Sequence, residues 1–190
     1  MAKTSKFTTA VLVLIPVVVG INYAGKFFAE VLKLPLWLDS IGTILAAMLA
    51  GPVIGGLSGA INNIIYGLTA GPISFVYALT SVGIGVAAGL LYKAKMFDNA
   101  IKAILSGLII ALVATVISVP LNVVFWEGQT GNVWGDALFG VLRNKGFNIW
   151  IASFFDELVV DLVDKVLSAF IAFGIFKALP KTLIYTFREE

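Results

Sequence analysis

The sequence contains neither cysteine nor histidine, and only 13% of its 190 residues are charged. The two missing residue types exclude disulfide bonds, thiol nucleophiles, imidazole bases and the common transition-metal sites. Soluble domains carry about 25% charged residues, so the low charge, with 59% hydrophobic residues, predicts an integral membrane protein. A chain of this length fits one compact domain, 1–190, without a separate soluble module.

The chain also lacks the patterns of several functional classes. Its basic residues are scattered and its formal net charge is +2, so no nucleic-acid surface is predicted. The phosphate-binding motif G-x-x-x-x-G-K-[ST] does not occur. The opening MAKTSKFTTAVLVLIPVVVG starts like a signal peptide, but no small-residue cleavage site follows. We therefore expect it to remain as the first membrane span.

The hydrophobic runs predict an all-α integral membrane protein with six transmembrane helices in one compact bundle. Four runs, 7–24, 72–92, 101–125 and 147–176, match the roughly 20 apolar residues that a spanning helix needs. Residues 39–69 would form a helix of roughly 46 Å, too long for one upright span. Because the Gly51-Pro52 pair is a strong helix break, we expect two helices there, 39–50 and 53–69.

Basic residues indicate the orientation of these spans. Six spans put the N-terminus, the 93–102 loop and the C-terminus on one side of the membrane. That side carries Lys3, Lys6, Lys93, Lys95, Lys102, Lys177, Lys181 and Arg188, and the other carries Lys26, Lys33, Arg143 and Lys145. The positive-inside rule then places both termini in the cytoplasm. Five spans with an external N-terminus give the same imbalance, and only the Gly-Pro break and the helix length favour six.

The predicted external loops are rich in aromatic residues. All four tryptophans, Trp37, Trp126, Trp134 and Trp150, fall in or beside these loops. Since tryptophan favours the membrane interface, they form either an aromatic belt or a set of rings over a pocket mouth. The segment GNVWGDALFGVLRNKGFN between the last two spans predicts a short amphipathic segment on the outer surface.

Polar residues inside the spans gather in the outer half of the predicted bundle. Burying such residues in a membrane is costly, so their placement needs a reason. The residues are Asn62, Asn63, Tyr66, Tyr77, Asn122, Asp156, Glu157 and Asp161. They predict a polar cavity that opens outwards and closes inwards. Asn62 and Asn63 either contact a ligand or join helices by hydrogen bonds, and Asp161 with Lys165 forms either a structural pair or part of the ligand site. The several carboxylates of the last span would also suit a proton or cation path.

Glycines recur every four residues at Gly51, Gly55 and Gly59. Small residues at this spacing allow membrane helices to approach one another closely. We therefore expect the helix at 53–69 to pack tightly against a neighbour.

Over nearly its whole length the chain resembles the substrate-binding (S) components of energy-coupling factor (ECF) vitamin transporters. The resemblance is carried by the order of the spans, the block LDSIGTILAAMLAGPVIGGLSGAINNII and the ending DLVDKVLSAFIAFGIFKALPK. It implies high-affinity capture of a water-soluble vitamin or precursor at the bacterial cell membrane. It also implies three partners, a membrane scaffold (T) subunit and two cytoplasmic ATPase subunits, which use the ATP, while this chain holds no cofactor or metal.

The resemblance further implies where ligand and scaffold bind. The ligand site would lie in the outer half, with residues 33–42 as a gating loop, and would include Trp37, Asp39, Asn62, Asn63, Tyr66, Tyr77, Asn122, Trp126 and Asp161. The family often docks on its scaffold through an Ala-x-x-x-Ala pair on the first span. Here only Gly20 and Ala24 form such a pair of small residues, so the Gly51, Gly55 and Gly59 stripe is the alternative docking surface.

Pantothenate is the ligand that the overall similarity suggests. Its carboxylate would need a basic partner such as Arg143, Lys145 or Lys165. The acid-rich last span fits a cationic or neutral ligand better, such as a thiamine precursor, and riboflavin is a further candidate. Two other classes stay open: a non-transporting membrane scaffold or sensor subunit, and an intramembrane enzyme using the acids of the last span. The enzyme is disfavoured because no nucleophile–base pair is visible.

Overall fold

The computed structural model describes residues 8–187, and the regular secondary structure in this range is helical. The elements are α1 (Thr9–Val31), α2 (Ile41–Ala50), α3 (Pro52–Thr69), the 3₁₀ helix η1 (Pro72–Phe75), α4 (Ala78–Lys93), α5 (Ala100–Phe125), α6 (Val133–Asn144), α7 (Ile149–Ala178) and α8 (Lys181–Thr186). The prediction of an all-α chain is confirmed for the described residues. Lys3, Lys6 and Arg188, which contributed to the predicted orientation, lie outside the described residues.

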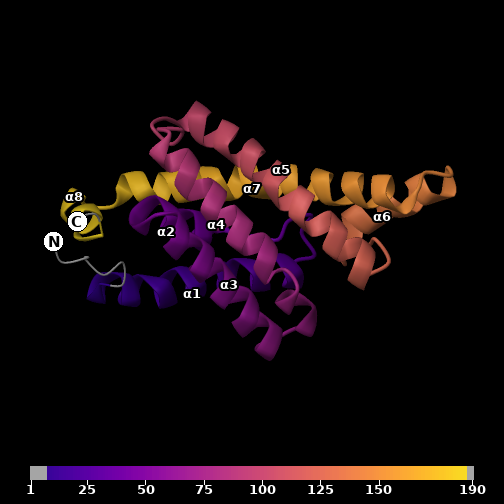
Figure 1. Cartoon of the computed structure of the whole chain (residues 1–190), viewed down its shortest axis with the longest axis horizontal. Coiled ribbons are helices and arrows are strands. Elements are labelled where there is room, and N and C mark those ends of the chain that lie inside the picture. The colour runs from indigo at the N-terminus through magenta and orange to yellow at the C-terminus, as the bar shows by residue number, and fades with distance from the viewer. Residues whose placement is uncertain (1–7, 188–190) are drawn as a thin grey trace.

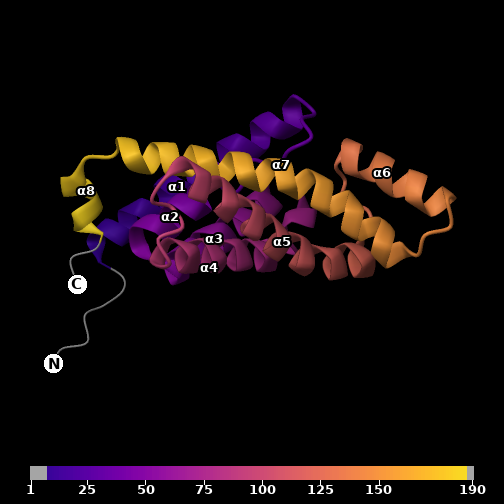
Figure 2. The same cartoon turned by 90° about the horizontal axis from the view of Figure 1, so that it is seen from above.

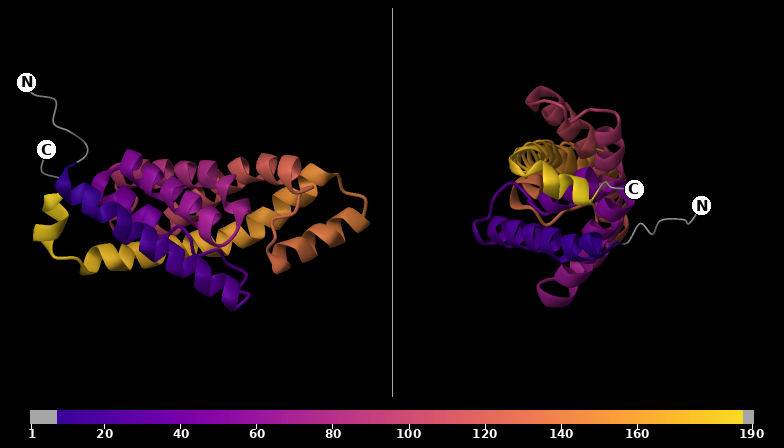
Figure 3. Two further views of the ribbon diagram at one scale, coloured as in Figure 1. Left: turned by 90° about the horizontal axis from the view of Figure 1, so that it is seen from below. Right: turned by 90° about the vertical axis from the view of Figure 1, so that its left-hand side faces the viewer.

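The helices form an elongated bundle, and α7 runs along most of its length (Figure 1). α5 packs along α7, and α3 packs along α4. The α2–α3 turn, the α4–α5 loop and α8 lie toward one end, which we call the α8 end. At the opposite end, the α6 end, α6 folds back beside α7 (Figure 2). α1 begins near the α8 end and crosses α7 obliquely as it proceeds (Figure 3).

The predicted break between the second and third helices is confirmed. Gly51 has a φ of +89°, a conformation that glycine adopts without the steric cost of a side chain. Pro52 is the first residue of α3, where its missing N–H removes no helical hydrogen bond. The sequence at these two positions therefore reverses the chain between α2 and α3.

Close contact between α2, α3 and α4 depends on glycine. A Cβ atom on Gly55 would lie 2.5 Å from Ala47 Cβ on α2. On α4, a Cβ on Gly85 would lie 2.2 Å from the backbone nitrogen of Gly56, and one on Gly89 would lie 2.5 Å from Pro52 Cα. These separations are shorter than any van der Waals contact, so the expectation that α3 packs tightly against its neighbours is confirmed.

The prediction that Gly51, Gly55 and Gly59 form the alternative docking surface needs a correction for two of the three. Gly55 and Gly59 are buried inside the chain, where they face α2 and α4, so they present no surface to a partner. Gly51 is half-buried at the turn. Gly20 and Ala24 on α1 are exposed, and a Cβ on Gly20 would meet no atom within 4 Å. A docking surface must be exposed. Among the predicted docking residues, the two on α1 are exposed.

Several helix boundaries differ from the predicted spans. α1 continues past the predicted end at residue 24 to Val31, and its polar residues Asn22, Lys26 and Glu30 recur every four positions along it. The predicted span 72–92 is divided: Pro72 opens the short η1, and α4 starts only at Ala78. The terminal helix α8 was not predicted.

The predicted amphipathic segment forms α6. Its inner face buries Gly135 and Phe139, and the helix packs against α7. Val133, Trp134 and Val141 remain exposed. The sequence therefore identified this helix correctly from its mixed pattern.

On α7, acidic residues lie on the buried face and apolar residues on the exposed face. On α7 the carboxylates Asp156, Glu157, Asp161 and Asp164 are all buried, whereas Phe155, Val159, Val163, Leu167 and Phe170 are exposed. In the described residues, α1 and α5 are long and apolar enough to cross a membrane by length and composition. α7 carries too many charges for that test, but the charged residues between Asp156 and Lys165 are buried, as in helices of membrane proteins.

Candidate functional site

A polar cavity of the kind predicted from the sequence lies between α1, α4, α5 and α7. It is formed by the last turns of α1, the first turns of α4, the second half of α5 and the first half of α7, and the α1–α2 loop contributes to its wall. Its lining residues are Lys26, Glu30, Trp37, Asp39, Ile73, Tyr77, Thr80, Ser81, Ile84, Ser118, Thr130, Glu157, Asp161 and Lys165. Charged, hydroxyl and aromatic groups thus surround one space.

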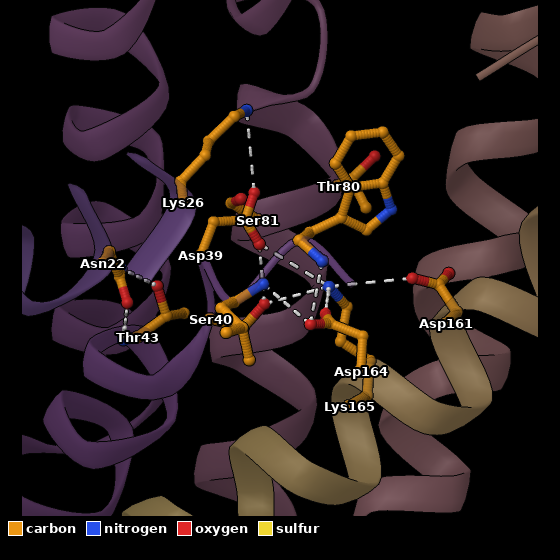
Figure 4. A network of polar contacts seen from close by, with 12 residues as sticks. Asn22, Lys26, Asp39, Ser40, Thr43, Thr80, Ser81, Asp161, Asp164 and Lys165 are labelled. Carbon is orange, nitrogen blue, oxygen red and sulfur yellow. Dashed lines mark hydrogen bonds and ion pairs between the residues drawn. The ribbon is translucent and has the colours of Figure 1, made fainter. Parts of the chain in front are cut away.

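Lys165 of α7, which lines the cavity, is the centre of an ionic network (Figure 4). Its Nζ lies 2.6 Å from Asp164 Oδ2 and 3.6 Å from both Asp161 Oδ1 and Asp39 Oδ1. It also donates a hydrogen bond to Ser40 Oγ at 3.0 Å. The predicted Asp161–Lys165 pair is present, and it is one part of a larger cluster.

Asp39 links the two cavity lysines. Its Oδ2 lies 3.9 Å from Lys26 Nζ of α1, while its Oδ1 faces Lys165 of α7. Burial by itself raises the pKa of Asp39, but the attraction of Lys165 and Lys26 outweighs it and lowers the pKa below its usual value. Asp39 is therefore held as a carboxylate between two helices.

Asp164 of α7 holds the α1–α2 loop in place. Its Oδ1 accepts hydrogen bonds from the backbone N–H groups of Trp37 and Leu38, at 3.1 and 2.7 Å. Leu38 has a φ of +51°, an uncommon conformation for a residue with a side chain. Carboxylate hydrogen bonds to these two amides explain how the loop keeps this strained conformation.

Lys26 stands at the α1 side of the cavity. Its Nζ donates to Ser74 Oγ at 3.0 Å and lies 4.6 Å from the centre of the Tyr66 ring. The Tyr66 hydroxyl donates to Glu30 Oε2 at 2.6 Å. Tyr66, predicted as a ligand residue, therefore supports two residues that line the cavity.

A second chain of hydrogen bonds approaches from α4 and α5. The Tyr77 hydroxyl donates to Asn122 Oδ1 at 2.5 Å, and Asn122 Nδ2 donates to Glu157 Oε2 at 3.1 Å. Asp161, one turn further along α7, accepts from Thr115 Oγ1 at 3.0 Å. Tyr77 lines the cavity, and Asn122 positions Glu157 from behind.

Four of the predicted ligand residues line the cavity: Trp37, Asp39, Tyr77 and Asp161. Asn62 and Asn63 do not line it, although both are fully buried. Asn63 Nδ2 donates to Ser81 Oγ at 2.6 Å and to Gly59 O at 3.2 Å, which fits the interpretation as a link between helices. Both amide atoms of Asn62 lack a hydrogen-bond partner within the described structure.

The tryptophans divide between the two predicted roles. Trp37 lines the cavity. Trp134 and Trp150 are exposed on the surface, at 62% and 50% of their full area, as expected for an aromatic belt. Trp126 is half-buried outside the cavity lining, and its Nε1 has no hydrogen-bond partner in the described part of the chain.

The sequence analysis missed part of the site. Lys26, Glu30, Thr80, Ser81, Ser118 and Thr130 line the cavity but were not among the predicted ligand residues. The regular spacing of Asn22, Lys26 and Glu30 in an otherwise apolar helix was a usable signal for two of them. Asn22 also joins α1 to α2, since its Oδ1 accepts the Gly42 N–H at 2.7 Å.

No group of three or more acidic, histidine or cysteine side chains suited to a metal ion is found among residues 8–187. In comparisons with known proteins, the family model described as "ECF transporter, substrate-specific component" matches residues 7–187. No curated protein and no solved structure matches the chain. The family match covers the bundle and every residue of the cavity.

Proposed function

Because the chain belongs to the family of ECF transporter substrate-specific components, we propose that it captures a water-soluble vitamin or vitamin precursor outside the cell. It then delivers this ligand across the membrane as the S subunit of an ECF-type transporter. The observation that supports the proposal is the polar cavity in a bundle with an apolar surface. Such a cavity gives a polar solute a site that the surrounding lipid cannot give.

Membership of the family implies association with the ECF T component and ATPase components in a membrane complex. In the proposed cycle the ATPases use ATP, and this chain contributes neither cofactor nor catalysis. Docking on the T subunit is assigned to the exposed face of α1 around Gly20 and Ala24. Small side chains there allow a partner helix to approach closely.

The proposed topology has α1, α2, α3, α4, α5 and α7 as six spans of one domain, residues 1–190, in a bacterial cell membrane. The α8 end faces the cytoplasm, in agreement with the positive-inside rule, because Lys93, Lys95, Lys102, Lys177 and Lys181 lie in or next to its helix ends and loops. The cavity, near the α6 end, then lies in the outer half.

Pantothenate and a cationic precursor make different demands on this cavity. Pantothenate needs a basic partner, but Arg143 and Lys145 do not line the cavity, and both Lys26 and Lys165 already contact carboxylates. A thiamine precursor, or another ligand with a positive charge, needs carboxylates, which the cavity supplies. The carboxylates therefore favour a cationic ligand such as a thiamine precursor over pantothenate. Riboflavin needs neither a basic partner nor a carboxylate.

Isothermal titration of the purified chain against pantothenate, thiamine, riboflavin and their precursors tests the function. Saturable binding of one compound to the chain alone is expected. A folded chain that binds none of them, yet purifies with T and ATPase subunits, would instead indicate a scaffold or sensor subunit.

A further inference from the structure

The charges that line the cavity do not balance. Two lysines, Lys26 and Lys165, face four carboxylates, those of Glu30, Asp39, Glu157 and Asp161. Both lysines are already engaged. Lys26 Nζ lies near Asp39, and Lys165 Nζ is shared between Asp39, Asp161 and the adjacent Asp164. No lysine remains to neutralise a further acid.

Glu157 is the buried cavity carboxylate left without a counter-charge, whereas Glu30, which also lacks an ion pair among the described residues, is exposed. It is only 4% exposed, and it lines the cavity. Among the described residues no lysine or arginine lies within 4.0 Å of its oxygens, and Asn122 Nδ2 donates to its Oε2 at 3.1 Å. A neutral amide satisfies a hydrogen bond but does not offset a charge.

A buried carboxylate without a cationic partner is costly, so its position calls for an explanation. The position of Glu157 is fixed by a chain of hydrogen bonds that runs from Tyr77 through Asn122. This chain fixes the carboxylate at the wall of the cavity. A ligand that enters the cavity meets it directly.

The groups around Glu157 suit a cation with polar and flat parts. Asp161 lies one helical turn away on the same face of α7 and adds a second negative charge. Trp37 and Tyr77, which also line the cavity, supply aromatic rings, which attract cations through their faces. Thr80 and Ser118, whose hydroxyls lie 3.0 Å apart, can donate or accept hydrogen bonds.

We propose that the captured ligand carries a positively charged nitrogen, which binds to Glu157 and supplies the counter-charge that this carboxylate lacks. The inference rests on the proposed function, ligand capture by this cavity, and adds the charge of the ligand and the residue that selects it. Amines and quaternary nitrogen rings belong to the class, and anionic vitamins do not.

Calorimetric titration of the purified full chain with a charge-matched series tests the inference. Pyridoxamine and pyridoxine share one ring and differ by a positive charge, while thiamine, riboflavin and pantothenate extend the series from cation to neutral compound to anion. We expect saturable binding of thiamine or pyridoxamine. If pyridoxamine is the compound that binds, it should bind at least about tenfold more tightly than pyridoxine.

The variant Glu157→Gln keeps a side chain of the same size that can still accept from Asn122. It should weaken binding of the cationic compound by about 30-fold or more. Glu127→Gln is the matched control, since Glu127 is exposed in the loop after α5 and does not line the cavity. The affinity of the Glu127→Gln variant for the cationic compound should equal that of the unaltered chain.

Binding of pantothenate or riboflavin in preference to both cations would overturn the inference and leave the proposed function intact. Cation binding that Glu157→Gln does not weaken would overturn the assignment of Glu157. If Glu157→Gln does not fold, the charge series on the unaltered chain still decides the charge of the ligand. Failure of every compound to bind the folded chain would overturn the proposed function together with this inference.

Discussion

The carboxylate of Asp164 accepts a hydrogen bond from the backbone N–H of Leu38 at 2.7 Å, although 126 positions separate the two residues. This contact joins the α1–α2 loop to the middle of α7. Because Trp37 and Asp39 of the same loop line the cavity, Asp164 positions one wall of the site without lining it. The loop to which the family resemblance assigns a gating role is thus bound to α7 through a buried acid.

Replacing Asp164 by asparagine should destabilise the protein substantially. Asparagine can still accept from the loop amides, but it cannot neutralise Lys165, whose Nζ lies 2.6 Å from Asp164 Oδ2. Lys165 keeps Asp39 and Asp161 at 3.6 Å, so the loss is that of its shortest charged hydrogen bond, typically about 1.5–3 kcal/mol. Thermal unfolding of the purified chain, followed by circular dichroism, should show a clearly lower midpoint for Asp164→Asn.

Asp98→Asn provides the control for this loss. Asp98 pairs with Lys102 at 3.5 Å, but this pair is largely exposed, and such pairs contribute about 0–1 kcal/mol. Its midpoint should stay close to that of the unaltered chain. Equal shifts for the two variants would mean that the Asp164 pair contributes no more than a surface pair.

Gly85→Ala should destabilise the bundle, because a single methyl group there has no space. Its Cβ would lie 2.2 Å from the backbone nitrogen of Gly56, and backbone atoms cannot move aside as a flexible side chain can. Overpacking typically costs about 1–3 kcal/mol. Gly174→Ala on α7 is the control, since nothing lies within 4 Å of its Cβ position. Comparable unfolding midpoints for the two variants would contradict the close approach of α3 and α4.

Local features of this fold could be predicted from the sequence, and long-range ones could not. Gly51-Pro52 specifies a helix break through its own backbone conformations, and the amphipathic pattern of α6 specifies a surface helix. The pairing of Asp39 with Lys26 and Lys165 depends on how three separate segments pack, which residue spacing does not encode. For the same reason the sequence located acids near a cavity but missed Lys26 as a lining residue.

The two adjacent asparagines of α3 should respond oppositely to leucine. Asn63→Leu removes the donor to Ser81 Oγ and should lower stability by about 1–3 kcal/mol. Asn62→Leu replaces an amide whose atoms have no partner in the described structure, so stability should be unchanged or higher. Unfolding midpoints of both variants check this contrast. A loss of ligand affinity in Asn62→Leu without a loss of stability would return Asn62 to the site, as the sequence first suggested.

The proposed topology predicts which loops a membrane-impermeant thiol reagent can reach in intact cells. The chain has no cysteine, so each introduced cysteine reports one position. Lys95→Cys, in the α4–α5 loop at the α8 end, should stay unlabelled until the cells are opened. Gln129→Cys, exposed between α5 and α6, should label from outside. Labelling of Lys95→Cys in intact cells would reverse the proposed orientation.

Trp37 should report ligand binding by its fluorescence, because it is the one tryptophan among the cavity-lining residues of the described chain. A compound that binds in calorimetry should change the emission of the unaltered protein, and Trp37→Phe should remove most of that change while keeping an aromatic ring in the wall. Trp134→Phe is the matched control, since Trp134 is 62% exposed on α6 and should retain the full response. If Trp37→Phe retains the response and Trp134→Phe loses it, the ligand binds at the surface near α6, and the cavity between α1, α4, α5 and α7 is not the capture site.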